Sequence, residues 1–492
     1  MEESSIMKNM KSFLNALPNN KEAEAYGVYP KSIFSSNQLW VMMAADEDCD
    51  YLIASGEGQE AFKGEDLGYI KAPLTHENAH VLRELFPFTK ARKVLHEKRS
   101  FGLGDRLGIA GDGHLRVFDC YDAYPILAQQ SIRELNLTQR TYEDVMDAAT
   151  FAVFRHGFTR GFGADGDHLK TRQDIEYALG LGFTMLTLDC SDYIRNDILG
   201  LSHDQLKEDV ELSDLHKDRY MKSSFDVEGS TIEFDEAELM RCELIYGKAI
   251  QYTIEIYNDY IKDRDAANFE LSIDETATPT TPTQHFFVAN ELYEAGVKLD
   301  TMAPRFVGEF QKGVDYIGDL VAFEKDLDIH AKIARHFGYK LSIHSGSDKF
   351  SIFTLVGKYT RGNFHVKTAG TNWLEAMRVV AMKDPQLYRE IHAYALSMFD
   401  TASQFYHVTT NIHRIPDLSS LSDEALPSLF TDNDARQLIH ITYGYILNDK
   451  QPDGTYRFKD KLYKLWREER DTYAKALEKH IGRHLELLYQ GF

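Results

Sequence analysis

Eight short apolar or glycine-containing segments alternate with helical stretches along this 492-residue chain, and this alternation constrains its fold most. Strands that alternate with helices build parallel sheets, because each helix carries the chain back to the same end of the sheet. Eight is also the number of strands that a closed (β/α)8 barrel requires. The sequence therefore predicts an α/β fold, a TIM-like barrel with strands at 100–103, 124–128, 157–163, 185–189, 269–274, 299–302, 340–344 and 364–367.

Segments outside this alternation are expected to extend the barrel. Residues 1–95 are mixed in pattern and are interpreted as an N-terminal cap or subdomain, and the barrel is assigned to 96–384. A polar insertion, about 196–265, separates the fourth and fifth strands. Residues 385–492 are expected to form a helical C-terminal extension.

The charge and cysteine content limit the class of partner. A formal net charge of -22 argues against nucleic acid or an anionic membrane, since both select basic patches. The four cysteines have no CxxC spacing and are interpreted as reduced thiols. No apolar run approaches the roughly 20 residues that span a bilayer, and no signal-peptide pattern is present. We expect a cytoplasmic enzyme with a small-molecule substrate, and a homo-oligomer is compatible with the sequence.

Polar side chains follow all eight predicted strands, at the barrel end where active sites are built. Each has a structural alternative: Asp105 and Arg106 can form an ion pair, and the turn expected at 165–168 also suits helix capping. Polar residues at the ends of all eight strands together favour an active site at this end of the barrel. The candidates are Asp105, Arg106, Gln130, Asp167, His168, Lys170, Asp189, Asp274, Glu275, Arg305, His344, Lys349, Lys367 and Thr368.

His168, Glu275 and His344 form a candidate metal-binding set of two imidazoles and one carboxylate. Such sites bind zinc, manganese, nickel, cobalt or iron and leave positions open for substrate oxygens. Zinc is the preferred ion, with manganese, nickel or cobalt as alternatives. Asp167 is an alternative fourth ligand, and His365 is an alternative imidazole.

Basic residues at the same strand ends are expected to hold an anionic group of the substrate or to polarise a carbonyl. The candidates are Lys170, Arg305, Lys349 and Lys367, each of which can equally be a solvated loop residue. No Walker motif is present, so a nucleoside triphosphate is not expected.

Four runs resemble the tagaturonate epimerase family: SFGLGDRLG at 100–108, GADGDHLKT at 163–171, LSIHSGSDKF at 341–350 and FHVKTAGT at 364–371. The resemblance covers about 95–390. It implies a metal-dependent enzyme that interconverts D-tagaturonate and D-fructuronate, 2-keto hexuronates that differ at C4, and that in some members accepts tagatose and fructose. The chain also resembles, more distantly, class II aldolases and the accessory subunits of tagatose-bisphosphate aldolase. In those proteins an Asp-His pair follows a barrel strand, with the histidine as zinc ligand and the aspartate as proton-transfer group, and Asp167 and His168 match this pair. His344 matches a second metal-binding loop that comes later in their sequences.

Inversion at C4 limits the mechanism, because only the C3 proton is acidified by the C2 carbonyl. Oxidation at C4 needs a nicotinamide, and no GxGxxG motif with the required spacing follows a strand, so no nicotinamide is expected. Retro-aldol cleavage of C3–C4 needs a metal at the C2 and C3 oxygens and a base at the C4 hydroxyl. Asp167 is the expected base, with Asp189, Asp274 or Asp105 serving the other face. Lys367 as a Schiff-base electrophile is the lesser alternative.

The expected function is therefore metal-dependent C4 epimerisation of hexuronates. A metal-dependent ketose aldolase that releases its fragments, and a non-catalytic aldolase-type subunit, are the alternatives.

Overall fold

A closed barrel of eight parallel strands forms the centre of the protein, in a computed structural model that describes residues 10–17, 22–264 and 267–492. The strand order is β12-β13-β14-β15-β6-β7-β8-β9, which confirms the predicted fold. The strands are β6 (Arg99–Leu103), β7 (Tyr124–Ser131), β8 (Gly163–Leu169), β9 (Met185–Asp189), β12 (Asn268–Ile273), β13 (Thr301–Pro304), β14 (Lys340–Ile343) and β15 (Phe364–Thr368).

The third barrel strand begins later than the sequence suggested, so the prediction of a strand at 157–163 was wrong. Gly157 instead ends the preceding helix in a left-handed conformation, with φ of 65°. Asp165 and Asp167 therefore lie within β8, not in a turn after it. Their carboxylates are buried against charged partners inside the barrel, which is how so polar a segment forms a strand.

Helices surround the barrel and bury its apolar outer surface. Their ends follow local signals; for example, Thr141 and Asp144 form a capping box at the start of α5. These helices are α3 (Gly111–Cys120), α4 (Ile132–Thr138), α5 (Tyr142–His156), α6 (Arg172–Gly180), α9 (Glu236–Ile256), α10 (Pro282–Glu294), α11 (Leu320–Phe337) and α12 (Phe353–Tyr359).

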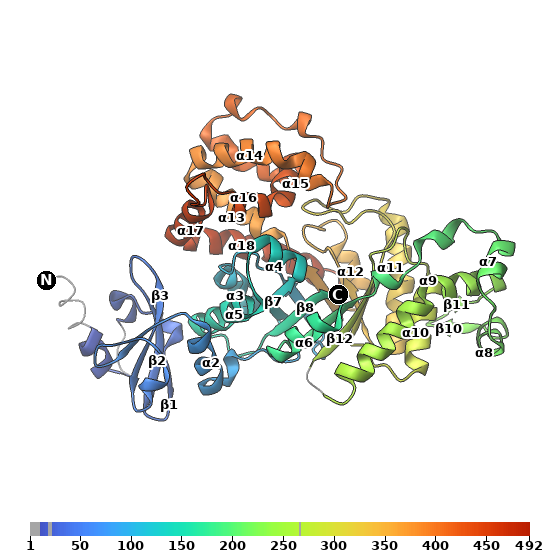
Figure 1. Ribbon diagram of the computed structural model, residues 1–492, viewed down its shortest axis with the longest axis horizontal. Coiled ribbons are helices and arrows are strands. Elements are labelled where there is room, and N and C mark those ends of the chain that lie inside the picture. Colours follow the sequence, from blue (N-terminus) through green and yellow to red (C-terminus); the bar gives the residue numbers. More distant parts are fainter. Residues whose placement is uncertain (1–9, 18–21, 265–266) are drawn as a thin grey trace.

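Two smaller units lie on opposite sides of the barrel (Figure 1). The first is an antiparallel sheet with the order β1-β2-β3-β5-β4, followed by α2 (His76–Leu85). Its strands are β1 (Phe34–Ser36), β2 (Leu39–Ala45), β3 (Asp50–Gly56), β4 (Glu65–Asp66) and β5 (Ile70–Pro73). The second lies between β9 and β12 and comprises α7 (His203–Asp209), α8 (Asp214–His216), the hairpin β10 (Phe225–Val227) and β11 (Ser230–Ile232), and α9.

The C-terminal helices have their own apolar core, but the last of them returns to the barrel. Helix α18 packs against α12, which follows β14, and against α3, which follows β6. Because β15 lies between β14 and β6, α18 occupies the position of the eighth barrel helix. The helices are α13 (Thr371–Lys383), α14 (Pro385–Ser403), α15 (Asn433–Ile441), α16 (Tyr443–Asn448), α17 (Lys459–Glu468) and α18 (Arg470–Tyr489).

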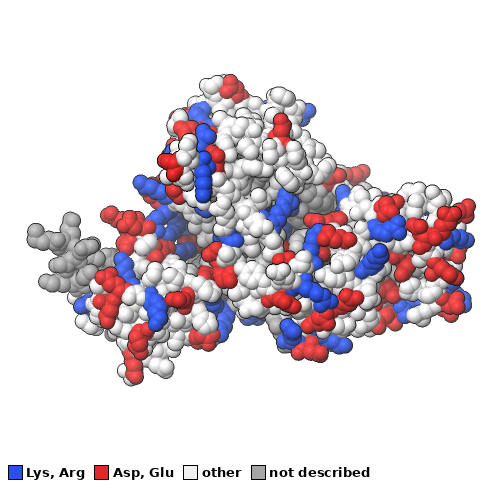
Figure 2. Space-filling view, viewed as in Figure 1, with Lys and Arg blue, Asp and Glu red and all other residues white. Residues whose placement is uncertain are grey.

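The surface carries both signs of charge, and Figure 2 shows acidic and basic side chains interspersed over the face in view. Within the described residues, no helix has the length and apolarity needed to cross a membrane.

Candidate functional site

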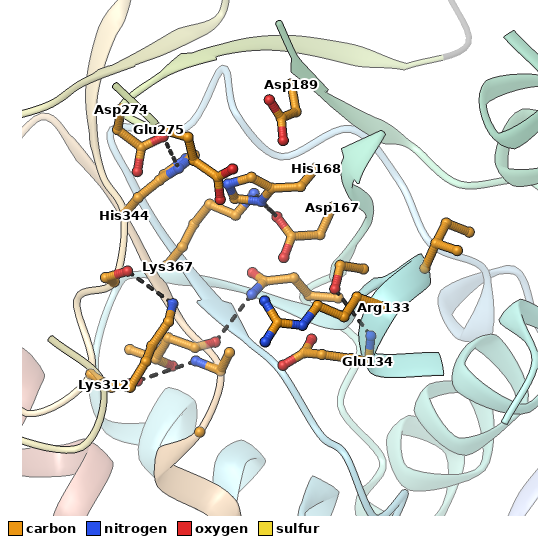
Figure 3. Close-up of a pocket in the computed structure, with 18 of the residues that line it drawn as sticks. Arg133, Glu134, Asp167, His168, Asp189, Asp274, Glu275, Lys312, His344 and Lys367 are labelled. Carbon is orange, nitrogen blue, oxygen red and sulfur yellow. Dashed lines mark hydrogen bonds and ion pairs between the residues drawn. The ribbon is translucent and has the colours of Figure 1, made fainter. Parts of the chain in front are cut away.

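A cavity of about 540 Å³ opens at the C-terminal ends of the barrel strands (Figure 3). It is lined by residues from β7, β8, β9 and β15 and from the loops that follow β12 and β14. The barrel thus gathers residues from distant parts of the sequence. The predicted residues that line the cavity are Arg106, Asp167, His168, Lys170, Asp189, Asp274, Glu275, His344, Lys367 and Thr368.

Two histidines and one carboxylate are close enough to share a cation. One ligand atom each from His168, Asp274 and His344 lies within 4.8 Å of the other two. The rings of the two histidines are 4.9 Å apart between centroids. The predicted set of His168, Glu275 and His344 differs from this cluster at one position, since the nearby carboxylate is Asp274 where Glu275 was expected. Glu275 lines the cavity beside it.

The outer nitrogen of each imidazole contacts a carboxylate. His168 Nδ1 lies 2.8 Å from Asp167 Oδ1, and His344 Nε2 lies 2.7 Å from Glu270 Oε1. His344 Nδ1 faces Asp274 at 3.2 Å. Metal-binding histidines are commonly oriented by a carboxylate in this way, which leaves the other ring nitrogen for the ion. The donor set of two imidazole nitrogens and one carboxylate therefore fits a divalent metal such as zinc or manganese.

An irregularity in β8 aims His168 at this cluster. The register between β8 and β9 shifts between Gly166 and Leu169, as in a β-bulge. His168 lies inside this shift and has a positive φ of 54°, which is uncommon for a residue with a side chain. Bulges redirect side chains and are frequent near active sites. Here the bulge places both Asp167 and its neighbour His168 on the cavity wall, although consecutive residues of a regular strand point to opposite faces.

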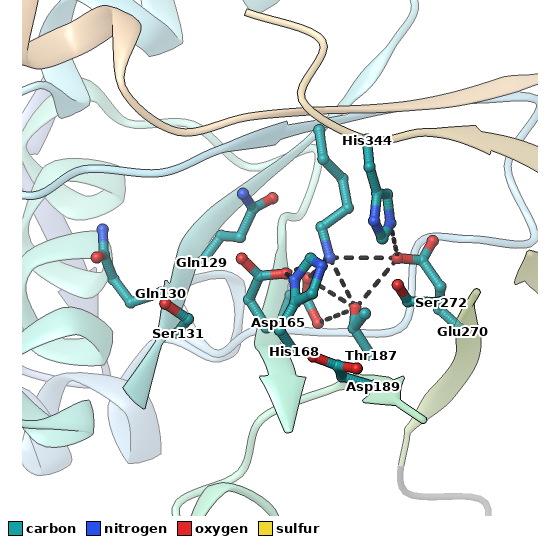
Figure 4. A network of polar contacts seen from close by, with 12 residues as sticks. Gln129, Gln130, Ser131, Asp165, His168, Thr187, Asp189, Glu270, Ser272 and His344 are labelled. Carbon is teal, nitrogen blue, oxygen red and sulfur yellow. Dashed lines mark hydrogen bonds and ion pairs between the residues drawn. The ribbon is translucent and has the colours of Figure 1, made fainter. Parts of the chain in front are cut away.

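Beneath the cluster, the side chain of Lys367 is buried in an ion network. Figure 4 shows other members of this network, among them Asp165, Thr187 and Glu270. Lys367 Nζ donates to Asp165 at 2.6 Å and to Thr187 Oγ1 at 2.7 Å. It also lies 2.6 Å from Asp167 and 3.2 Å from Glu270. Burial alone would lower the pKa of Lys367, but these carboxylates hold it well above its usual range. Lys367 is therefore an ammonium ion, which disfavours its predicted alternative role as a Schiff-base nucleophile.

The same network sets the charge of the residues above it. Burial would raise the pKa of Asp167, but Lys367 and His168 hold it well below its usual range. Burial would lower the pKa of His168, but Asp167 raises it to about 10. Asp165 differs, since burial raises its pKa to about 6 despite the neighbouring lysine. Asp167 is thus an ionised carboxylate that faces the cavity, and Asp165 is a buried partner of Lys367.

Asp189 and Lys170 line the cavity on its β9 side. Asp189 Oδ1 accepts a hydrogen bond of 2.8 Å from the backbone N–H of Ser191. Lys170 Nζ donates to Ser191 Oγ at 2.7 Å and to Asp192 at 2.8 Å, and it lies 3.7 Å from Asp189 Oδ2. Lys170 therefore has an anionic partner of its own.

Three predicted residues lie away from this cavity. The Asp105 carboxylate accepts the backbone N–H groups of residues 107, 108 and 110 at 3.1, 2.9 and 2.8 Å, which is a structural turn. Lys349 Nζ donates to the carbonyls of residues 311, 314 and 347 at 2.9, 2.6 and 3.0 Å, and burial lowers its pKa to about 7. Gln130 is buried on β7. Neither Asp105 nor Lys349 is placed to touch a substrate.

Two other candidates border the site without joining the cluster. Arg305 lines an adjoining hollow that shares Asp274 and Glu275 with the main cavity, and it donates to the carbonyl of Thr276. His365 is buried inside the barrel, where its Nδ1 contacts Ser100 Oγ at 3.0 Å, and burial lowers its pKa to about 3.

Several lining residues escaped the sequence analysis. Arg133, Glu134, Lys312 and Tyr406 lie in helical or loop segments whose pattern gives no indication of a cavity. Glu270 and Thr187, which belong to the ion network beneath the cavity, were also missed, although each is a polar residue flanked by apolar neighbours on its strand.

A family model described as tagaturonate epimerase matches residues 29–488. The tagaturonate/fructuronate epimerase of Thermotoga maritima is 41% identical over 475 residues, which are 94% of this chain and 97% of that protein. A glycerol-complexed crystal structure of fructuronate-tagaturonate epimerase UxaE from Cohnella laeviribosi is 50% identical, with a TM-score of 0.93 over 98% of this chain and 99% of that chain. A second, with two glycerols, is 49% identical, with a TM-score of 0.94 over 99% of both chains.

Proposed function

Because this chain belongs to the tagaturonate epimerase family, we propose that it interconverts D-tagaturonate and D-fructuronate by metal-dependent retro-aldol chemistry at C4. It is an isomerase by its family. The observation that carries the chemistry is the cluster of His168, Asp274 and His344 at the mouth of the barrel, with a carboxylate behind each histidine.

The cluster supports a divalent ion held by two imidazoles and one carboxylate. When bound, such an ion supplies positive charge beside the C2 and C3 oxygens of a 2-keto hexuronate and so favours the enediolate that forms when C3–C4 breaks. Glu270 and Asp167 orient the two histidines for this task. The buried ammonium of Lys367 balances part of the negative charge beneath them.

Asp167 is the proposed base for the C4 hydroxyl. Its contacts with His168 and Lys367 both use Oδ1, and the side chain lines the cavity. As Asp167 takes the hydroxyl proton, the C3–C4 electron pair moves to C3. This gives the enediolate of the C1–C3 fragment and an aldehyde at C4 of the C4–C6 fragment. Rotation of the aldehyde then presents its other face to C3, which re-forms the bond with inverted C4.

Asp189 is the proposed second acid–base group. It lines the same cavity from the neighbouring strand, whereas Asp105 lies in a structural turn and Asp274 lies in the ligand cluster. Asp189 relays a proton from solvent to the new C4 oxygen, and Asp167 releases the first proton to solvent, so that one proton is taken up and one is given back.

The test is turnover of D-tagaturonate by the purified full-length chain, without added nicotinamide, before and after exhaustive chelation. We expect chelation to abolish epimerisation and zinc, manganese, nickel or cobalt to restore it. Full activity after the metal has been removed would refute metal dependence, and an inactive metal-loaded chain would favour a non-catalytic subunit. Released three-carbon fragments in place of the C4 epimer would favour an aldolase.

The base is tested with Asp167→Asn at saturating metal. Loss of the carboxylate that orients His168 is expected to weaken metal affinity by about 10- to 100-fold. The fully loaded variant should still lack epimerase activity, as judged by kcat with bound metal measured in parallel. A loaded variant with wild-type kcat would exclude Asp167 as the base.

A further inference from the structure

We propose that Arg133 and Lys312 together bind the carboxylate of the substrate and so select hexuronates over neutral ketoses. This inference rests on the proposed function, since it assigns the charged end of that substrate to one side of the same cavity. Both residues line the cavity, and neither was predicted from the sequence.

Most of the lysine and arginine side chains that line the cavity are already paired. There are five of them, and three have carboxylate partners. Arg106 pairs with Glu134 at 2.9 Å, Lys170 with Asp192 at 2.8 Å, and Lys367 with Asp165 at 2.6 Å.

Arg133 and Lys312, by contrast, have no acidic side chain within 4.0 Å in the described parts of the chain, although the protein has a formal net charge of -22. They are therefore the cations that remain available to an anionic ligand in this cavity.

Neutral contacts hold both side chains in place without neutralising them. Arg133 lies in the first turn of α4, donates from Nη2 to the carbonyl of Phe405 at 3.0 Å, and lies 4.3 Å from the ring centroid of Tyr406. Lys312 lies in the loop between β13 and α11 and donates to Ser345 Oγ at 3.0 Å. Each retains further N–H groups for a ligand, because an ammonium has three and a guanidinium five.

The position of the pair suits the far end of a linear sugar acid. Figure 3 shows the His168–Asp274–His344 cluster in the upper part of the view and Arg133 and Lys312 below it, at the right and the left. Asp167 lies between the cluster and Arg133. In a 2-keto hexuronate the C2 and C3 oxygens are at one end, the C4 hydroxyl follows, and the C6 carboxylate is at the other end. The cavity offers partners in the same order: the cluster for an ion near the C2 and C3 oxygens, Asp167 for the C4 hydroxyl, and Arg133 and Lys312 for the C6 carboxylate.

Two further features of the cavity favour an anionic ligand. Ala369 and Gly370 line the cavity at the start of α13, a 13-residue helix whose N-cap residue Gly370 offers no side-chain cap. Arg106, only 3% exposed, also lines the cavity, and its Nη1 has no hydrogen-bond partner among the described residues. A carboxylate accepts several such donors at once.

The four cations assigned to this role from the sequence have other partners. Lys170 and Lys367 are paired with carboxylates, while Lys349 and Arg305 donate to backbone carbonyls. The structure therefore replaces them with a pair from α4 and the loop after β13.

The experiment compares Arg133→Gln, Lys312→Met and the double variant with the wild type. We expect KM for D-tagaturonate to rise about 10- to 100-fold in each single variant, as for loss of one charge-assisted contact, with kcat changed only a few-fold. The inhibition constant of D-tagatose, which lacks the carboxylate, should stay within about twofold of the wild-type value.

The increase of KM for D-tagaturonate with ionic strength should be weaker in the variants than in the wild type. Arg133→Lys and Lys312→Arg, which keep the charge, should retain most of the affinity.

Lys325→Met is the matched control, because Lys325 is exposed on α11 and lies outside the cavity lining. Unchanged KM for D-tagaturonate in the double variant would overturn the proposal. Equal weakening of D-tagatose and D-tagaturonate would also overturn it, since that result indicates loss of cavity shape. Calorimetric Kd values for D-tagaturonate separate the proposed carboxylate contact from the proposed epimerase activity. If the wild-type chain binds D-tagaturonate without epimerising it, the proposed activity is refuted. The Kd values of the variants then still test the carboxylate contact.

Discussion

Asp274 and Glu275 are adjacent in the sequence, but their side chains occupy different positions in the cavity. Asp274 lies within ligand distance of His168 and His344, whereas Glu275 is more exposed and lines the wall beside them. Asp274→Asn is therefore expected to lower zinc affinity by more than about tenfold, as loss of a direct ligand should exceed the effect of losing an orienting group. Glu275→Gln is expected to keep its metal.

Metal content after dialysis against a graded series of chelator concentrations distinguishes the two variants. The isosteric pair provides its own control, because each change removes one negative charge at neighbouring positions. Equal metal loss in both variants would contradict the assignment of Asp274 as the ligand.

The two histidines of the cluster were proposed because His344 ends a predicted strand and His168 follows one by five residues. The sequence prediction named Glu275, whereas the carboxylate close to both histidines is Asp274, since the sequence could not resolve the strand end to a single position. The unpaired cations could not be predicted at all. Whether a lysine is free or paired depends on acidic residues far along the chain, as Lys367 and Asp165 show across 202 positions.

At the scale of elements, β8 shows where sequence patterns fail. Gly163–Leu169 contains two aspartates, a histidine and two glycines, and such a composition indicates a turn. The segment is a strand because Lys367 and Thr187, from β15 and β9, provide partners for its buried carboxylates. Strand propensities reflect how well a side chain packs on an apolar pleated surface. They therefore do not predict a strand that is stabilised by a buried ion network.

Another element-scale contact joins the loop after β14 to the C-terminal helices. Asp348 lies 2.5 Å from His480 on α18 and 2.9 Å from Arg436 on α15. His484 accepts the backbone N–H of Asp348 through Nε2 at 3.0 Å. Burial would raise the pKa of Asp348, but Arg436 and His480 hold it well below its usual range. The ion pair therefore fixes the loop that carries His344 to its neighbours.

This contact predicts a pH dependence of stability. A carboxylate whose pKa is lower in the folded state stabilises the protein above its unfolded value of about 3.9, and this contribution is lost as the pH falls further. Asp348→Asn should lower the free energy of unfolding at pH 7 by about 3–5 kcal/mol, because it leaves Arg436 buried without its partner. The variant should also show a flatter stability profile below about pH 5.

Urea unfolding between pH 3 and 7 measures both effects. Asp453→Asn, at an exposed turn, is the comparison for a carboxylate without a buried partner. A variant whose acid sensitivity equals that of the wild type would show that Asp348 does not contribute through its charge.

For the whole molecule, the alternation of strands and helices was sufficient to predict the barrel, but not which helices form its wall. Residues 385–492 were expected to extend the barrel, yet α18 within them completes the ring between α12 and α3. An amphipathic pattern indicates that a helix buries one face without identifying the surface that receives it.

The returning helix should be as important for stability as any barrel helix. Leu485 on α18 is fully buried in the barrel core, so Leu485→Ala is expected to lower the free energy of unfolding by about 2–5 kcal/mol. Glu478 on the same helix is largely solvent-facing, and Glu478→Ala should stay within about 0.5 kcal/mol. Denaturation followed by helical signal and by activity should give one coincident transition for both probes. Wild-type stability of Leu485→Ala would show that the barrel does not depend on the packing of this helix.

The position of α18 also bears on how the protein is synthesised. Translation delivers all eight strands before it delivers the helix that covers the gap between α12 and α3. A nascent barrel therefore keeps an uncovered apolar side until α18 has left the ribosome. Exposed apolar surface on such intermediates is what chaperones bind and what drives aggregation. A chain truncated before α18 would accordingly be prone to aggregation, although all eight barrel strands and the residues that line the cavity are present.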